Sequence, residues 1–249
     1  MSKTFSLYSK YYDLLYKDKD YKGEANYLAD IILEHANGAK SILELGSGTG
    51  IHGMIFKEMG FDVFGIEQSE SMTKKAIQNG YPCKVGDITD FKLERKFDVV
   101  FSLFHVVSYI TDNEKLHAVF KNAFDHLNEG GIFVFDTWYG PAVHNLKPET
   151  RMKRVSNDEI DVARIAQSDF HENRNVVDVN YTIFIKDKKS NQTKEINEKH
   201  PMRYFTIPEI DNMARFCGFE LVKTEEFLSK VPASKETWGV NFILKKINK

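Results

Sequence analysis

Residues 42–53, ILELGSGTGIHG, contain two overlapping glycine motifs. Read from Gly48, the spacing is G-x-G-x-x-G, which is typical of dinucleotide-binding turns. Read from Glu44, the spacing is E-x-G-x-G-x-G. Either motif, placed between a strand and a helix, directs backbone N–H groups and the positive end of the helix at a nucleotide. The first register predicts an NAD-dependent oxidoreductase that transfers hydride, and the second predicts a different nucleotide.

Acidic residues distinguish the two registers. Glu44 precedes the first glycine by two residues, where a carboxylate attracts an ammonium group and repels a pyrophosphate. Glu67 ends the next predicted strand, about 20 residues past the turn, where an acid binds ribose hydroxyls in either register. Asp87, in GDITDF, follows a third predicted strand at the rim where an adenine amine can be bound. Glu44 and Asp87 therefore favour the second register.

From residue 41 to residue 137, the predicted elements that must position these residues alternate between strand and helix. Apolar runs predict strands, and amphipathic patterns between them predict helices, an order typical of a parallel sheet covered on both faces. Strands are expected at 41–45, 61–67, 83–85, 97–104 and 132–137, with a turn at Gly130 and Gly131, and helices at 52–59, 69–78 and 113–127. Residues 1–35 are also expected to be helical.

The pattern changes after Trp138. Between residues 152 and 205 no helix is predicted, and β-branched runs at 161–170, 175–186 and 194–205 are separated by turn residues at 173–175 and 188–192. These features predict an antiparallel sheet inserted into the α/β domain. A helix capped by Thr206 and two further strands then complete the chain.

Composition narrows the classes of function. A net charge of -2 offers no basic field for nucleic acid, and no apolar stretch approaches the ~18 residues of a membrane span. The two cysteines, Cys83 and Cys217, lie far apart, and no His or Asp motif has metal-ligand spacing. We therefore expect a cytoplasmic protein that binds no metal, no nucleic acid and no membrane.

Several motifs together carry a family resemblance. In order and spacing, ELGSGTG, Glu67, GDITDF, FDVVFSLF, LNEGGIFVFDTW and WGVNFILKK resemble the class I S-adenosylmethionine (SAM)-dependent methyltransferases over nearly the whole chain. More narrowly, YYDLLYKDKDY, ELGSGTGIHG and the β-rich segment entered through Trp138, Tyr139 and Pro141 resemble bacterial nucleotide-sugar N-methyltransferases, which dimethylate amino-deoxysugars. Family members usually read D-V-A-C-G-T-G at the turn, and usually carry two adjacent tryptophans where this chain has only Trp138.

The resemblance implies a fold and an activity. The fold is a Rossmann-like seven-stranded methyltransferase sheet with an inserted antiparallel β subdomain. Residues 1–36 would form a helical cap over the cofactor, 37–149 the SAM-binding core, 150–205 an acceptor lid or homodimer surface, and 206–249 the completion of the core. The acceptor would be nitrogen or oxygen of a small sugar-like metabolite, free or nucleotide-linked, of surface-polysaccharide or secondary metabolism. The alternatives are the NAD-dependent oxidoreductase and a protein that binds SAM without turnover.

The resemblance also implies how the cofactor is held. The glycines would line its methionine part, Glu67 its ribose, and Asp87 with Ile88 its adenine, while Tyr21 is a partner for its carboxylate. The expected cofactor-binding residues are Tyr21, Glu44, Gly46, Ser47, Gly48, Gly50, Glu67, Gln68, Asp87, Ile88 and Leu103.

The acceptor side offers catalytic candidates. A neutral amine needs no strong base during methyl transfer, whereas a hydroxyl must lose its proton as the bond forms. Tyr8 and Tyr12 share one helix face, and the resemblance implies an N-terminal tyrosine that closes over the cofactor. His105 and Tyr109 follow the fourth strand, where ligands bind at the carboxyl ends of parallel strands. Acceptor-binding candidates are Trp138, Tyr139, His200 and Arg203, the last as a partner for phosphate. Packing within the fold is the alternative for each candidate.

Overall fold

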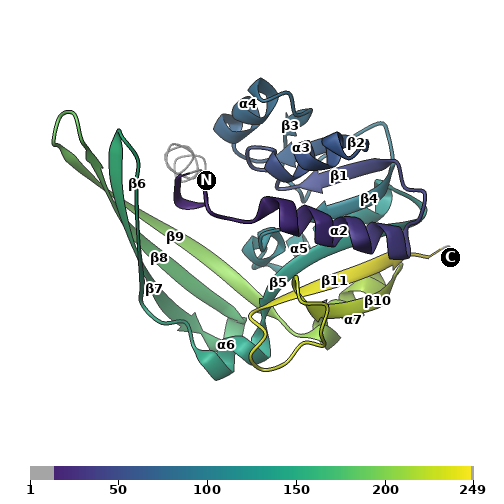
Figure 1. Cartoon of the computed structure of the whole chain (residues 1–249). Coiled ribbons are helices and arrows are strands. Elements are labelled where there is room, and N and C mark those ends of the chain that lie inside the picture. Colours follow the sequence, from purple (N-terminus) through teal and green to yellow (C-terminus); the bar gives the residue numbers. More distant parts are fainter. Residues whose placement is uncertain (1–13, 248–249) are drawn as a thin grey trace.

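The central feature of the structure, a computed structural model that describes residues 14–247, is a mixed β-sheet covered by helices on both faces (Figure 1). In chain order the elements are α2 (Tyr21–His35), β1 (Ser41–Leu45), α3 (Ile51–Glu58), β2 (Asp62–Glu67), α4 (Glu70–Gln78), β3 (Cys83–Val85), β4 (Phe97–Ser102), the 3₁₀ helix η1 (Val106–Tyr109), α5 (Asn113–Asp125), β5 (Leu127–Tyr139), α6 (Gly140–Leu146), β6 (Arg151–Ser156), β7 (Ile160–His171), η2 (Glu172–Arg174), β8 (Val176–Asp187), β9 (Thr193–Phe205), α7 (Ile207–Phe216), β10 (Phe219–Glu226) and β11 (Gly239–Lys246).

The core part of the sheet has the strand order β3-β2-β1-β4-β5-β11-β10. The first five strands are parallel, and β11 runs antiparallel to both β5 and β10. The predicted seven-stranded Rossmann-like sheet is therefore confirmed. Because the carboxyl ends of the five parallel strands share one edge, the turns that follow β1, β2 and β4 lie close together.

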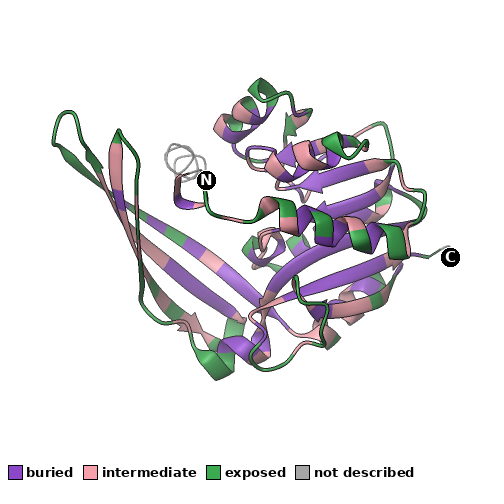
Figure 2. Ribbon diagram, in the orientation of Figure 1, coloured by how far each residue is buried: buried purple, intermediate pink, exposed green. Residues whose placement is uncertain are grey.

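Each face of this sheet buries its own apolar cluster. Along β5, Phe133 and Phe135 pack with α5 and α7, whereas Ile132 and Val134 pack with α2, α3 and α4 on the opposite face. This alternation follows from the two-residue period of a strand. Figure 2 shows the resulting continuous burial of the central strands. Asp136 continues the row of Ile132 and Val134 and is fully buried at the carboxyl end of β5.

The insertion is an antiparallel meander of β6, β7, β8 and β9 that extends away from the core (Figure 1). Its turns fall near the predicted positions, and Asn175 adopts the left-handed conformation that asparagine tolerates. At its base, β9 pairs in parallel with β5, joining Trp138 to Tyr204 and Tyr139 to Phe205. The insertion is therefore a continuation of the core sheet through hydrogen-bonded strands.

Some local expectations were wrong. Residues 16–20 form a turn and an extended link, because the Asp20 side chain accepts the Gly23 N–H at 2.8 Å and begins α2 there. Gly130 and Gly131 lie inside β5, where Gly130 adopts a φ of +72° and the pairing with β4 shifts register. Helix α6 and strand β6 were not predicted.

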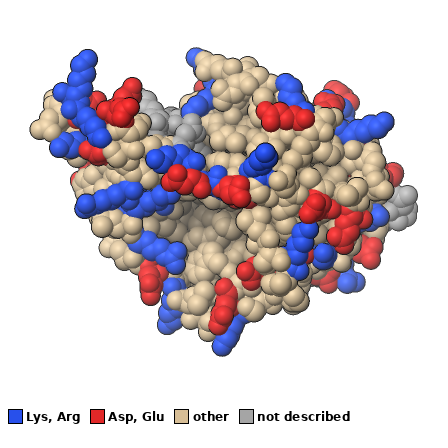
Figure 3. Space-filling model, in the orientation of Figure 1, with Lys and Arg blue, Asp and Glu red and all other residues tan. Residues whose placement is uncertain are grey.

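The described residues carry charge of both signs without a single dominant patch on the face that Figure 3 shows. Between residues 14 and 247, no helix is long and apolar enough to cross a membrane. Within the same range, no three His, Cys, Asp or Glu side chains cluster in a way that could hold a metal ion.

Candidate active site

The turn after β1 is formed by glycines in the left-handed region. Gly46 and Gly48 have φ values of +74° and +56°. A Cβ at Gly46 would collide with the loop after β4, whereas nothing lies within 4 Å of the Cβ position at Gly48. Gly53 instead lies inside α3, where a Cβ would meet the Tyr81 ring at 2.1 Å. The glycines that shape the turn are thus those of the register that begins at Glu44.

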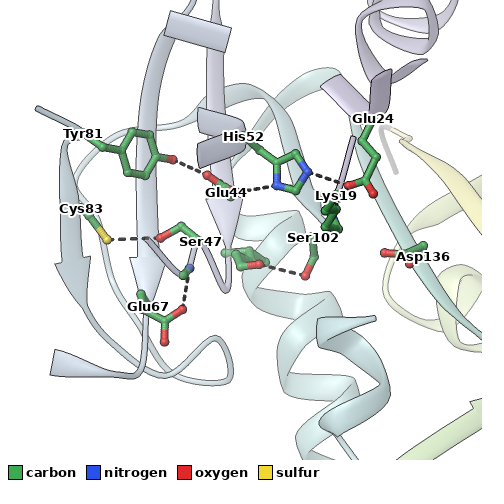
Figure 4. Close-up of polar contacts among 12 residues, drawn as sticks. Lys19, Glu24, Glu44, Ser47, His52, Glu67, Tyr81, Cys83, Ser102 and Asp136 are labelled. Atoms are coloured by element: carbon green, nitrogen blue, oxygen red, sulfur yellow. Dashed lines mark hydrogen bonds and ion pairs between the residues drawn. The ribbon is translucent and has the colours of Figure 1, made fainter. Parts of the chain in front are cut away.

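Glu67 ends β2 beside this turn (Figure 4). Its carboxylate accepts the Gly48 N–H and the Ser69 N–H, each at 2.8 Å, so one buried acid ties the turn to the start of α4. Burial raises the pKa of Glu67, while these backbone hydrogen bonds oppose the rise. Gln68, Asp87 and Ile88 follow β2 and β3 next to Glu67, and Asp87 accepts a hydrogen bond from the Gln68 amide at 3.3 Å.

A chain of buried polar side chains runs behind the turn (Figure 4). Lys19 donates to Glu24 Oε2, which lies 2.7 Å from His52 Nε2. His52 Nδ1 lies 3.8 Å from Glu44 Oε1, and the Tyr81 hydroxyl donates to Glu44 Oε2 at 2.7 Å. The chain connects the segment before α2 to the acid that begins the glycine motif.

Burial governs the charge of this chain. It raises the pKa of Glu44 to about 8, despite the opposing hydrogen bond from Tyr81, and it lowers the pKa of His52. At neutral pH, Glu44 therefore holds a proton unless a positive charge approaches. The Lys19 ammonium already lies 4.3 Å from the Tyr21 ring centroid and 4.5 Å from that of Phe104, so these two rings form a site that accepts a cation.

The loop after β4 contains a histidine–aspartate pair. Phe104 and His105 both have positive φ values, +69° and +58°, which is unusual for two successive non-glycine residues. Asp136 stabilises this conformation, since its Oδ1 accepts the His105 N–H at 3.1 Å. Its Oδ2 also lies 2.6 Å from His105 Nδ1, which leaves Nε2 as the ring nitrogen for a ligand.

The insertion supplies the opposite wall with aromatic and basic side chains. Beside it, Trp138 of β5 and Trp238, which precedes β11, place their rings 5.2 Å apart. The Arg164 guanidinium lies 4.6 Å from the Tyr181 ring centroid and donates to the Tyr16 hydroxyl at 3.1 Å. These contacts link β7 and β8 to the segment that precedes α2.

A single cavity of about 460 Å³ connects the glycine turn with this wall. Its lining comprises Tyr16, Tyr21, Glu44, Gly46, Ser47, Gly48, Thr49, Ile51, His52, Glu67, Met72, Leu103, Phe104, His105, Val106, Tyr109, Trp138, Arg151, Arg164, Tyr181, Met202 and Trp238. Residues from the core, the loop after β4 and the insertion thus face one space, in which two ligands can meet.

The structure brings many of the predicted residues together in this lining. They are Tyr21, Glu44, Gly46, Ser47, Gly48, Glu67, Leu103, His105, Tyr109 and Trp138. The predicted residues outside the lining are Gly50, Gln68, Asp87, Ile88, Tyr139, His200 and Arg203. Tyr8 and Tyr12 lie outside the described residues.

Three of the residues outside the lining have other contacts. Tyr139 donates its backbone N–H to the Trp238 carbonyl and packs against the apolar core. Arg203 lies 2.7 Å from Asn113 Oδ1 and 2.5 Å from Glu209 Oε1, which joins β9 to α5 and α7. His200 is buried behind Tyr109, whose hydroxyl lies 2.9 Å from His200 Nδ1.

Sequence reasoning missed several residues of the site. His52 is the second residue of the helix that follows the glycine turn, and it lines the same cavity. Arg164 and Tyr181 had no such signal, because their orientation depends on the register of β7 with β8.

The lining fits SAM better than a dinucleotide. The part of the cavity near the glycine turn contains two acids, Glu44 and Glu67, and two rings that already hold an ammonium. Carboxyl oxygens accept hydrogen bonds from ammonium and hydroxyl groups, and aromatic faces attract a cation, so this lining suits a cationic ligand with hydroxyl groups. The open space beside Gly48 lets such a ligand approach the backbone closely.

Comparison with known proteins agrees with this chemistry. Residues 42–131 match the family described as methyltransferase domain. Over 177 residues the chain is 34% identical to dTDP-3-amino-3,4,6-trideoxy-alpha-D-glucopyranose N,N-dimethyltransferase of Streptomyces venezuelae, covering 69% of this chain and 74% of the relative. This chain belongs to the class I SAM-dependent methyltransferases. The two alternative predictions, an NAD-dependent oxidoreductase and a protein that binds SAM without turnover, are therefore wrong.

Solved structures agree with the fold of the methyltransferase. The crystal structure of DesVI from Streptomyces venezuelae has a TM-score of 0.80 and 26% identity, covering 97% of this chain and 98% of that chain. The sugar N-methyltransferase KedS8 from a Streptoalloteichus species has a TM-score of 0.82 and 23% identity, covering 100% of this chain and 94% of that chain. The methyltransferase thus shares its fold, insertion included, with both proteins.

Proposed function

We propose that this methyltransferase transfers methyl groups to the amino nitrogen of a nucleotide-linked amino-deoxysugar. The observation that carries the proposal is the single cavity that runs from the glycine turn to Arg151 and Arg164 of the insertion. The similar enzyme of Streptomyces venezuelae, an N,N-dimethyltransferase of a dTDP-amino-sugar by its name, supports the same class of acceptor.

The residues of the chain have separate tasks in this reaction. When bound, SAM supplies a methyl group on a positively charged sulfur. Glu44, Glu67 and the glycine backbone hold the cofactor end of the cavity, which Tyr21 and Phe104 also line. Holding two reactants in line can contribute up to ~7–11 kcal/mol, so positioning is the main contribution of the protein.

His105 handles the proton of the acceptor. A methylated amine carries a positive charge until it releases a proton, and the acceptor nitrogen must be neutral to react again. Asp136 Oδ2 lies 2.6 Å from Nδ1 as an ion-pair partner, so Nε2 is the ring nitrogen that accepts that proton. The fully buried Asp136 stabilises the imidazolium that results.

The insertion binds the nucleotide end of the acceptor. Arg151 and Arg164 lie on the inner face of β6 and β7, and Arg151 makes no ion pair within residues 14–247. A guanidinium binds a diphosphate in bidentate fashion. Trp138 and Tyr181 offer ring faces for the sugar and the base.

The test is methyl transfer to a matched panel. We expect S-adenosylhomocysteine and a methylated product with nucleoside-diphosphate-linked 3-amino and 4-amino sugars, and much slower reaction with the corresponding hydroxyl sugars. Faster methylation of the hydroxyl sugars would make oxygen the acceptor atom. Equal methylation of the amino sugars without their nucleotide would refute the nucleotide-linked acceptor.

A pair of arginine variants tests the diphosphate contact. Arg151→Ala should raise the KM for the nucleotide-linked acceptor roughly tenfold or more, as expected for loss of a charged hydrogen bond of about 1.5–3 kcal/mol. Arg154→Ala is the matched control. Arg154 lies three residues beyond Arg151 on the same strand, and this odd separation places it on the opposite face. Equal effects of the two substitutions would rule out a specific role for Arg151.

A further inference from the structure

Trp238 lines the cavity from a part of the chain that belongs neither to the glycine turn nor to the insertion. It ends the loop between β10 and β11 and directly precedes Gly239, which pairs with Trp138 of β5. The centroids of the two indole rings lie 5.2 Å apart, with an angle of 60° between their planes. This indole pair, Trp138 and Trp238, therefore gives the cavity two aromatic surfaces at an angle to each other.

Hydrogen bonds fix the end of the loop that carries Trp238. The Trp238 carbonyl accepts the Tyr139 N–H at 3.0 Å, beside the pairing of β11 with β5. The preceding residue, Thr237, is 1% exposed, and its hydroxyl donates to Glu226 Oε2 at 2.8 Å. A ring whose backbone is held in this way loses less conformational freedom when a ligand packs against it. The loop therefore presents the indole of Trp238 in a largely preorganised position.

The indole pair lies in an apolar part of the cavity wall. Both rings pack against one apolar cluster, which includes the buried Met202. Tyr181 packs against the same cluster, and Met202 and Tyr181 line the cavity together with the indole pair. A ligand that reaches this part of the wall therefore meets mainly carbon surface.

His105 lies beside the indole pair. The centroid of its imidazole lies 6.4 Å from that of the Trp138 ring. A Cβ at Gly239 would lie 3.2 Å from His105 Cε1, so the imidazole packs close to the residue that follows Trp238. Under the proposed function the amine of the acceptor lies at His105, and the sugar carbons next to that amine then face the indole pair.

We propose that the indole pair selects deoxysugars, with Trp238 as a specificity-determining residue, by packing against sugar carbons that carry no hydroxyl group. A hydroxyl pressed against an indole face loses its hydrogen bonds to water, whereas a C–H or methyl group packs there favourably. The inference rests on the proposed function, because it takes a nucleotide-linked sugar as the ligand of the cavity. It concerns which sugar binds, and it is independent of which atom is methylated.

Binding tests the contact without turnover. The probes are dTDP-glucose and its 6-deoxy and 4,6-dideoxy derivatives, each added together with S-adenosylhomocysteine. By calorimetry, we expect the unaltered protein to bind the 4,6-dideoxy sugar about tenfold or more tightly than dTDP-glucose. The chain contains two tryptophans, both in the cavity lining, so Trp138→Phe leaves Trp238 as the single tryptophan that emits. Its fluorescence should change when the 4,6-dideoxy sugar saturates the protein. Equal affinity for the three sugars, or unchanged emission at saturation, would overturn the proposal.

Variants of Trp238 test the selectivity itself. Trp238→Ala should reduce the preference for the 4,6-dideoxy sugar to within about threefold, whereas Trp238→Phe should keep most of it, because phenylalanine retains an aromatic face. Glu236→Ala is the matched control, since Glu236 is an exposed residue of the same loop outside the cavity lining, and it should leave the preference unchanged.

The outcomes separate this inference from the proposed function. An unchanged preference in Trp238→Ala would overturn the role of Trp238, even if the unaltered enzyme methylates amino sugars. A preference that depends on Trp238, in an enzyme that methylates no amino sugar, would support the selectivity of the indole pair and overturn the proposed reaction alone.

Discussion

Asp136 holds His105 at two points: Oδ2 lies 2.6 Å from the ring Nδ1, and Oδ1 accepts the backbone N–H at 3.1 Å. One buried carboxylate therefore contacts the ring and also accepts a hydrogen bond from the left-handed backbone that presents it. The cost of that backbone, about 1–2 kcal/mol, is offset within the same pair of residues.

Asp136→Asn should separate these two tasks. The amide oxygen can still accept the His105 N–H, but the amide nitrogen would donate to Nδ1 and force the ring proton onto Nε2. We expect kcat to fall about 10²–10⁴-fold, with SAM affinity nearly unchanged. His105→Asn should show a similar loss, because asparagine tolerates positive φ. A kcat within threefold of the unaltered enzyme in Asp136→Asn would contradict the role of His105.

Binding of SAM should release protons from Glu44. Burial raises the pKa of this carboxyl to about 8 in the ligand-free protein, so it is mostly protonated at pH 7. A cation nearby favours the ionised form, and binding should therefore strengthen as pH rises toward 8 and level off above it. Calorimetry at pH 7 in buffers of different ionisation enthalpy measures the protons released. Glu44→Gln should release none, and an unaltered protein that releases none would show that Glu44 does not face the charge.

The two glycines of the turn should differ in their tolerance of alanine. Gly48→Ala adds only the left-handed strain of about 1–2 kcal/mol, because its Cβ position is open. Gly46→Ala adds a collision, since its Cβ would lie 2.6 Å from Val106 Cγ1, and should cost a further ~1–3 kcal/mol in urea unfolding. Val106→Ala combined with Gly46→Ala should recover part of that difference. An equal decrease in the free energy of unfolding in the two single variants would contradict the packing argument.

Glu24 should stabilise the protein in a pH-dependent way. Burial raises its pKa, but hydrogen bonds from His52 and Lys19 and the charge of Lys19 outweigh that effect and lower it below 4.5. A carboxyl whose pKa is lower in the folded state stabilises above about 4.5 and loses this contribution as pH falls through the lowered value. Glu24→Gln should thus lower the free energy of unfolding by about 1–3 kcal/mol at pH 7, and less in acid.

The control for Glu24 lies on the same helix. Glu34 is more than half exposed, and its oxygens lie 3.4 Å from His35 and 3.7 Å from Lys223. Exposed ion pairs contribute little, so Glu34→Gln should leave urea unfolding nearly unchanged at both pH values. A pH-independent loss in Glu24→Gln would mean that the side chain acts through packing rather than through its charge.

The sequence predicts the parts of the site that depend on local signals. Glu44, Glu67 and the glycines stand directly at strand ends, and a strand end in a parallel sheet lies at the ligand edge whatever the rest of the chain does. The same reasoning located His105, which follows β4. These positions needed no knowledge of contacts between distant segments.

The parts that depend on pairing between distant strands could not be predicted. Whether Arg164 or its neighbour faces the cavity depends on the register of β7 with β8, and a shift of one residue would reverse the faces. Glu24 and His52 meet because α2 packs beside α3, which no local pattern encodes. Asp20 shows the converse case, since its side chain caps α2 and a capping residue is a local feature of the sequence.

The parallel pairing of β9 with β5 constrains how acceptor preference can change in this protein. The residues between Tyr139 and Tyr204 leave and rejoin the sheet at two register pairs, Trp138 with Tyr204 and Tyr139 with Phe205. A segment taken from a relative can have different loop lengths and different wall residues, provided that it preserves these two register pairs. Under the proposed function, evolution, or an engineer, can therefore replace the wall that the insertion supplies as a module while the cofactor half of the cavity is inherited intact.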